Sequence, residues 1–477
     1  MKKLIQKMRG APITLKASIA VFLSSVLLKG IAFITIPIFT RILGTEQYGT
    51  IALYNSWLSI LEVFAVLGLT SAGSFNVGLN DNKNEPYRYM ANCLCICNCA
   101  TIICFLIIFV LKKFCILNLI LPNNLLLLML IHLFFYPAQI FWIFYQRYEY
   151  KYKLSTTLVV VSTVLGQVLS VYGVLNSSQE NGAFIKLLYT ELLSLFVSVP
   201  LYFVILIKGK IHFNIQKWKV ILKYIIPLIP HYLAQHIMAS ADKIMIAKYI
   251  ANTQAGIYSV VLNIAMIFDV MWSAVSASLI PYTFKKIEEK KYDEIKKTSN
   301  ALVIIFSILC IIIMLIAPEV MKILAPEKYY IGVYLVPALM LVSFTKVLYN
   351  LFANIEFYYK KSDKILLATL IATAVNLLLN QIFIPRFGFI AAAYTTLISY
   401  ILLIIMHYVG YKECDGKNSI YNDKFIFKIL FLLMIIAGVS YVLYLNTYIR
   451  YTVLVAVCII GILKKNVFIK SIKELLT

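Results

Sequence analysis

Fourteen apolar stretches long enough to cross a lipid bilayer occupy most of this chain, and the charged residues lie mainly in the short gaps between them. A helix needs about 20 apolar residues to cross the hydrocarbon layer. The stretches are continuous rather than alternating, and each is longer than the roughly 10 residues of a barrel strand, so helices are predicted. The predicted spans are 17–40, 49–71, 90–111, 125–146, 155–176, 183–207, 221–247, 255–280, 299–317, 333–355, 365–384, 388–408, 426–445 and 451–463.

The composition supports the same fold class. Of 477 residues, 61% are hydrophobic and only 14% are charged, which leaves too little polar surface to cover a soluble particle of this size. The sequence therefore predicts an all-α, polytopic membrane protein with 14 transmembrane helices.

The basic side chains predict the orientation in the membrane. If the N-terminus is cytoplasmic, 31 of the 44 Lys and Arg residues fall in the termini and cytoplasmic loops, and eight fall in the opposite loops. This bias fits the positive-inside rule and predicts that both termini are cytoplasmic. The net charge of +23 then reflects topology and contact with membrane lipids, so no nucleic-acid partner is predicted.

No loop carries a sequence typical of catalysis or of cofactor binding. Glycine-rich phosphate loops, His–Glu metal pairs and nucleophile elbows are all missing from the sequence. The four alternate cysteines from Cys93 to Cys99 would point about 200° apart around a helix, so they cannot converge on one metal ion. The chain is therefore predicted not to be an enzyme, with no cofactor and no metal site.

An internal repeat organises the chain. Shifting residues 14–76 by 207 positions lays them on 221–283 without a gap, so that a cation, a glycine and an acid coincide. The coinciding pairs are Arg41 with Lys248, Gly49 with Gly256, and Glu62 with Asp269. This offset corresponds to six spans, so the two copies share one orientation, as in secondary transporters built from parallel repeats.

The repeat predicts two six-helix bundles around a central cavity, followed by two additional helices. The predicted parts are a cytoplasmic N-terminus (1–13), the first bundle (14–207), a cytoplasmic linker (208–220), the second bundle (221–410), two extra transmembrane helices (411–463) and a basic cytoplasmic tail (464–477).

A short motif after the first span resembles a known family. The segment from Arg41 to Gly49, Arg-Ile-Leu-Gly-Thr-Glu-Gln-Tyr-Gly, resembles the Arg-x-Leu-Gly-x-x-x-Tyr-Gly signature of polysaccharide biosynthesis transporters, the Wzx-type O-antigen and capsule flippases. The segment from Asp242 to Tyr258 is similar to the start of that family's second bundle. The family belongs to the exporter superfamily that also contains drug–cation antiporters and the lipid II flippase MurJ.

The resemblance implies a flippase in the bacterial cytoplasmic membrane. Its substrate would be an oligosaccharide repeat unit linked to undecaprenyl pyrophosphate, moved by alternating access with a proton or sodium gradient as the expected driving force. Polysaccharide assembly proteins are expected partners.

Ionisable and polar groups inside the spans are candidates for substrate contact, because a charge in the hydrocarbon costs at least about 2.5–3.5 kcal/mol. The residues predicted to bind the anionic substrate are Lys29, Lys243, Lys346, His231, Gln235 and His236. The residues predicted to couple or gate transport are Glu62, Asp269, Asp242, Arg41 and Lys248. Three alternatives remain open. The lysines and acids inside the spans could simply neutralise one another between helices. Glu62 and Asp269 could instead hold helices together, and Arg41 and Lys248 could simply extend their side chains to the membrane surface.

Two other functions fit a chain of this kind less well. A drug–cation antiporter of the same fold would usually have 12 spans and an anionic pocket. An O-antigen polymerase or ligase would have a large external loop, and the longest external gaps here, about 111–124 and 318–331, are short.

Overall fold

The computed structural model describes residues 13–69, 74–114, 119–210, 215–416 and 419–463, and all of its regular elements are helical. The chain divides into two compact units, with the boundary between Ser240 and Ala241 inside one helix, α10 (Ile229–Tyr249). The predicted cytoplasmic N-terminus and basic tail lie outside the described residues, apart from Ile13. The predicted bundle boundaries at 207 and 221 remain a prediction.

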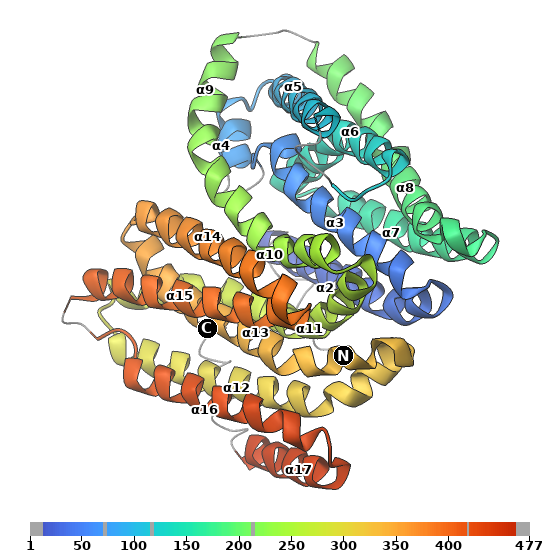
Figure 1. Cartoon of the computed structure of the whole chain (residues 1–477). Helices are drawn as coiled ribbons and strands as arrows, with labels where there is room; N and C mark the ends of the chain where they lie inside the picture. Colours follow the sequence, from blue (N-terminus) through green and yellow to red (C-terminus); the bar gives the residue numbers. More distant parts are fainter. Residues whose placement is uncertain (1–12, 70–73, 115–118, 211–214, 417–418, 464–477) are drawn as a thin grey trace, which may run out of the picture. The chain divides into compact units, whose positions relative to one another are not determined.

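The first unit is a bundle of long helices with two short helices at its corner (Figure 1). Helix α8 packs against α3, α5, α6 and α7, while α3 and α6 are the most buried long helices of the unit. Its helices are α2 (Ile13–Ile42), α3 (Thr45–Val66), α4 (Ser74–Asp81), α5 (Pro86–Lys113), α6 (Asn123–Tyr148), α7 (Tyr152–Leu175), α8 (Gly182–Gly209), α9 (Ile215–Ile225) and the first part of α10, with 3-10 turns at Gln179–Asn181 and Ile226–Leu228.

The second unit is built around α13, which packs against α11, α12, α14, α15 and α16. Its last two helices pack on α12, where Tyr444 donates a hydrogen bond to the Met314 carbonyl and Arg450 pairs with Glu319. The helices of this unit that follow the end of α10 are α11 (Asn252–Glu288), α12 (Tyr292–Leu324), α13 (Val336–Tyr358), α14 (Ser362–Phe387), α15 (Ile390–Asp415), α16 (Asp423–Leu443) and α17 (Thr447–Leu463), with a 3-10 segment at Glu327–Leu335.

Twelve helices in the described residues are long and apolar enough to cross a membrane, and they coincide with twelve of the fourteen predicted spans. The other two predicted spans correspond to α10 and α17. Helix α17 has only 17 residues, and polar side chains interrupt the apolar sequence of α10. The predicted seventh span, 221–247, is also broken at the 3-10 turn containing Pro227, because proline cannot donate the backbone hydrogen bond that would continue α9 into α10.

The repeat offset of 207 also relates helix ends. Helix α2 ends at Ile42 and α3 begins at Thr45, while α10 ends at Tyr249 and α11 begins at Asn252. The copies differ further along: α3 ends at Val66, whereas α11 runs unbroken to Glu288. Leu67 and Gly68 adopt positive φ angles of 53° and 63° in the first copy, which ends the helix.

Val275 stands at the position of the second copy that corresponds to Gly68, and a β-branched residue strongly disfavours positive φ. This difference accounts for the single long helix α11. Because α3 ends at Val66, Glu62 lies one turn before the end of its helix.

The close packing between α13 and α15 predicts how a substitution at Gly410 changes stability. A Cβ atom at Gly410 would overlap the Glu356 carboxylate, which is buried and paired with His407. Gly410→Ala should therefore lower the free energy of unfolding by about 1–3 kcal/mol, as overpacking does in other cores. Gly438→Ala is the matched control, since nothing lies within 4 Å of its Cβ position. Thermal unfolding in detergent measures both variants, and equal melting temperatures would contradict the packing.

Candidate functional site

In the second unit, a buried carboxylate is held by neutral donors from three helices. Asp242 on α10 is 5% exposed. Its Oδ2 accepts hydrogen bonds from the Tyr258 hydroxyl at 2.6 Å and the Thr396 hydroxyl at 2.7 Å. Its Oδ1 accepts from Asn380 Nδ2 at 2.8 Å. The half-buried Lys243 follows it in the sequence and interacts with it electrostatically.

A second layer of amide and hydroxyl groups surrounds these donors. Asn376 donates to Thr396 Oγ1 at 3.0 Å and accepts from Asn380 Nδ2 at 3.2 Å, and the Thr395 hydroxyl donates to Asn380 Oδ1. All four side chains are buried. Buried charges normally need an opposite charge or several hydrogen bonds. A carboxylate in such surroundings can hold a proton or a hard cation such as sodium.

The sequence did not indicate that Asn376, Asn380, Thr395 and Thr396 belong to the surroundings of Asp242. The available signal was polar residues inside apolar spans, with Asn376 and Asn380 four residues apart and therefore on one face of α14. That spacing indicates a helix interface, but it does not indicate Asp242 as the partner.

Two other predicted site residues form an ion pair in the second unit. Lys346 Nζ on α13 lies 2.9 Å from Asp269 Oδ2 on α11. Both side chains remain about one-third exposed, at 30% and 34%, and Lys346 also lies 5.8 Å from the centre of the Tyr400 ring. The sequence had assigned Lys346 to substrate and Asp269 to coupling, so the structure joins two residues that were given separate roles.

The predicted residues on the first part of α10 lie in the first unit. His236 Nδ1 is 2.8 Å from the Ser59 hydroxyl on α3, whereas the Gln235 side chain is exposed. His231 is half-buried, and its ring lies edge-on to Tyr232 at 5.6 Å between ring centres. These polar side chains therefore occupy different surroundings rather than one cluster.

The remaining predicted cations lie on exposed helix surfaces. Lys29 is exposed in the middle of α2. Arg41, near the end of α2, donates a hydrogen bond to the Pro37 carbonyl at 2.8 Å. Lys248 is exposed near the end of α10, 5.2 Å from the centre of the Tyr249 ring. Glu62, the last predicted acid, is half-buried and hydrogen-bonded to Tyr136.

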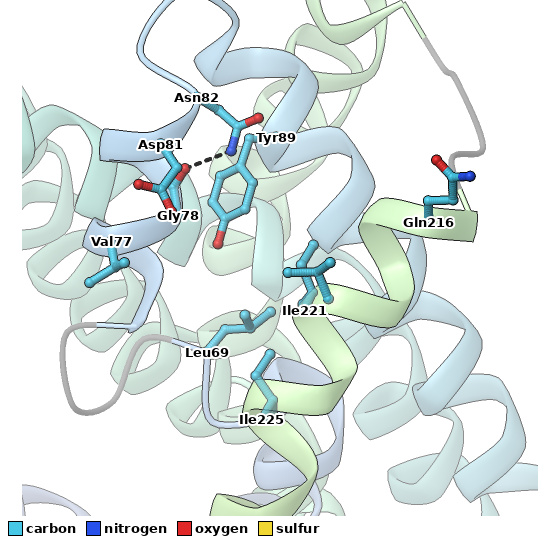
Figure 2. Close-up of a pocket in the computed structure, with 10 residues that line it drawn as sticks. Leu69, Val77, Gly78, Asp81, Asn82, Tyr89, Gln216, Ile221 and Ile225 are labelled. Carbon is cyan, nitrogen blue, oxygen red and sulfur yellow. Dashed lines mark hydrogen bonds between the residues drawn. The ribbon is translucent and has the colours of Figure 1, made fainter.

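A pocket of about 360 Å³ lies at the corner of the first unit, between α4, α5 and α9 (Figure 2). Leu69, Ile221 and Ile225 form its apolar side, and Asp81 and Asn82 lie at the end of α4. No Lys or Arg is among its principal lining residues, and none of the predicted site residues is. An apolar pocket with a carboxylate does not suit a pyrophosphate group.

Comparison with known proteins identifies the family. Residues 14–287 match a family model described as polysaccharide biosynthesis protein. The chain belongs to this family. The resemblance found in the segment from Arg41 to Gly49 is therefore confirmed.

The chain is also similar to proteins of Haemophilus influenzae. A protein of the Lsg locus of Haemophilus influenzae is 25% identical over 387 residues, which cover 76% of this chain and 91% of that protein. An uncharacterised membrane protein of the same organism is 28% identical over 140 residues, 28% of this chain and 34% of that protein.

The fold is that of MurJ and MATE transporters. The lipid II flippase MurJ in an inward closed conformation matches with a TM-score of 0.63 at 15% identity, covering 95% of this chain and 99% of that chain. An inward-facing multidrug resistance MATE transporter of the MOP superfamily matches with a TM-score of 0.54 at 15% identity, covering 82% and 94%. The chain is a multi-pass membrane protein, and the solved structures it resembles are transporters rather than enzymes.

Proposed function

We propose that this protein is a flippase that moves oligosaccharide repeat units linked to undecaprenyl pyrophosphate across the bacterial cytoplasmic membrane. The observation that carries the proposal is the combination of a polysaccharide biosynthesis family match with a MurJ-like fold along nearly the whole chain. O-antigen, capsule and exopolysaccharide units are the expected cargo. Anchoring a sugar chain to a polyprenyl lipid keeps the hydrocarbon part in the membrane, so the protein has to shelter only the polar head.

The proposed mechanism is alternating access by two bundles. Lys29, together with Lys243 and the polar face of α10, would attract the pyrophosphate, since fixed cations act strongly on phosphate where water is scarce. Lys346 is paired with Asp269, so it would serve substrate only when that ion pair opens. The pair is partly exposed, which lowers the cost of opening it.

Asp242 is the acid best suited to coupling. Its hydrogen-bond donors are neutral, so binding a proton or a cation changes the net charge of its surroundings. A ligand that binds one conformation better than another shifts the equilibrium between them. Glu62 and Asp269 remain candidates for the same role, and Arg41 and Lys248 for gating.

A drug–cation antiporter is the second candidate function. The likeness to a MATE transporter favours it, as does the buried carboxylate of Asp242. Purified protein in sealed vesicles separates the two: the flippase proposal predicts movement of a polyprenyl-pyrophosphate oligosaccharide and no movement of a cationic drug.

The proposed orientation makes a topology prediction. A reporter that is active only in the cytoplasm should give signal when fused after Lys290, at the turn between α11 and α12, and none when fused after Asn252, at the start of α11. The reason is the six lysines between Lys285 and Lys297. The reverse pattern would overturn the predicted orientation.

A further inference from the structure

Three helices of the first unit bring a polar side chain to the same level. Tyr54 on α3, His132 on α6 and Glu191 on α8 each lie nine residues after the first residue of their helix. At about 1.5 Å per residue this is roughly 14 Å from the helix ends, near the middle of a hydrocarbon layer about 30 Å thick. Polar groups at that depth need a partner inside the protein.

Glu191 contacts both Tyr54 and His132, and all three side chains are almost fully enclosed. Tyr54, His132 and Glu191 are 0%, 7% and 4% exposed. His132 Nδ1 pairs with Glu191 Oε2, and the Tyr54 hydroxyl donates a hydrogen bond to Glu191 Oε1 at 3.3 Å. The imidazole therefore lies against a buried carboxylate that has one further donor.

A second carboxylate is connected to this pair. The His132 ring stacks on the Tyr136 ring, with 4.8 Å between ring centres, and Tyr136 is hydrogen-bonded to Glu62. Glu62 lies eight residues beyond Tyr54 on α3, which is about 12 Å further along the helix. Glu191, His132, Tyr136 and Glu62 thus form a continuous series of contacts within the first unit.

The surroundings of the pair set its charge. The titratable and charged groups that face it are Tyr54 and Glu62 on α3, Tyr136 on α6 and Lys186 on α8. Lys186 in turn lies over the Phe39 ring of α2, and its carbonyl accepts a hydrogen bond from Ser170 of α7. With a neutral imidazole, the Glu191 carboxylate leaves the His132–Glu191 pair with a net charge of −1. One proton on the imidazole makes the pair neutral.

We propose that the His132–Glu191 pair binds one proton and is a proton site of transport, a role that rests on the proposed function. Enclosing a net charge is costly, so the closed cluster favours the protonated, neutral form, and opening it to water favours release of the proton. Histidine is suited to this exchange near neutral pH. The bound proton stays on the pair until the unit opens.

The second unit contains a chemically matched pair that serves as a control. His407 and Glu356 are buried side by side, with exposed fractions of 2% and 1%. Glu356 lies near the end of α13 and His407 on α15, and Tyr349 of α13 stacks on His407 at 5.7 Å between ring centres. This pair joins α13 to α15 and has no role in the proton site.

The test is the titration of His132 in lipid membranes. The chain has five histidines, so protein labelled with ¹⁵N only in histidine gives few imidazole signals, and His132→Gln identifies the signal of interest. We expect the pH dependence of this signal to change in Glu191→Gln and in Tyr54→Phe, and to stay the same in Glu356→Gln. A wild-type signal that does not change with pH, or a pH dependence that is unchanged in Glu191→Gln, would overturn the proposal.

Transport measurements distinguish a failure of the proton site from a failure of the flippase proposal. In sealed vesicles, an imposed proton gradient should stimulate wild-type transport, and His132→Gln and Glu191→Gln should each lose that stimulation. Variants that keep the full response would refute the proton site even if the lipid is moved. If His132 titrates as expected but the wild type moves no lipid-linked oligosaccharide, the flippase proposal fails and the proton site stands.

Discussion

Replacing Lys29 by alanine should abolish surface polysaccharide in cells that depend on this protein, while the protein remains folded in the membrane. Lys29 is exposed in the middle of α2, and no carboxylate pairs with it in the part of the chain that the structure describes. A cation at this depth costs at least about 2.5–3.5 kcal/mol, and no fixed anion offsets that cost. A mobile anion, the substrate pyrophosphate, is the partner that its position favours.

Complementation of a deletion strain measures this effect, with protein level and thermal stability checked in membranes. Lys29→Arg should retain part of the activity, because the charge is kept but the shape differs. Lys83→Ala removes an exposed lysine in the turn between α4 and α5 and should complement like the wild type. Full complementation by Lys29→Ala would show that Lys29 is only a structural charge.

Replacing Asp242 by asparagine should remove the response of transport to an ion gradient with little effect on folding. Asparagine has nearly the same shape, and the Tyr258 and Thr396 hydroxyls can rotate to accept hydrogen bonds from its amide. Asp242→Asn therefore removes a negative charge and leaves the packing of the side chain unchanged. We expect the stimulation by an imposed proton or sodium gradient to fall at least about tenfold, which corresponds to about 1.4 kcal/mol.

Thr396→Val is the control for this experiment. It removes one hydrogen bond to Asp242, at a cost of about 1 kcal/mol in stability, and keeps the carboxylate. Its transport should still respond to the gradient. An Asp242→Asn variant with an undiminished response would remove Asp242 from the coupling role and leave it as a link between α10, α11, α14 and α15.

The helices were more predictable from the sequence than the site. Long apolar runs predict spans because the bilayer fixes their length, and helices occupy all fourteen predicted positions. The short helices α4 and α9 were not predicted, because each depends on a local break: Gly68 with positive φ after α3, and Pro227 after α9.

The partners of the polar residues were not predictable from one sequence. Lys346 has no acid within one turn of its own helix, and its partner Asp269 is 77 residues away. Asp242 receives a hydrogen bond from Asn380, 138 residues further along. Helical periodicity shows which residues share a face, but it does not show which face of another helix they meet.

The most direct test of the proposed function is movement of the lipid itself. Purified protein is placed in sealed vesicles that carry a polyprenyl-pyrophosphate oligosaccharide, and the fraction of sugar accessible to an external glycosidase is followed in time. Asp242→Asn and Lys29→Ala protein serve as controls, together with vesicles without protein. We expect wild-type protein to expose sugar from the inner leaflet, faster when a proton or sodium gradient is imposed. Accessibility no greater than in empty vesicles, with uptake of a cationic drug in the same preparation, would contradict the flippase proposal.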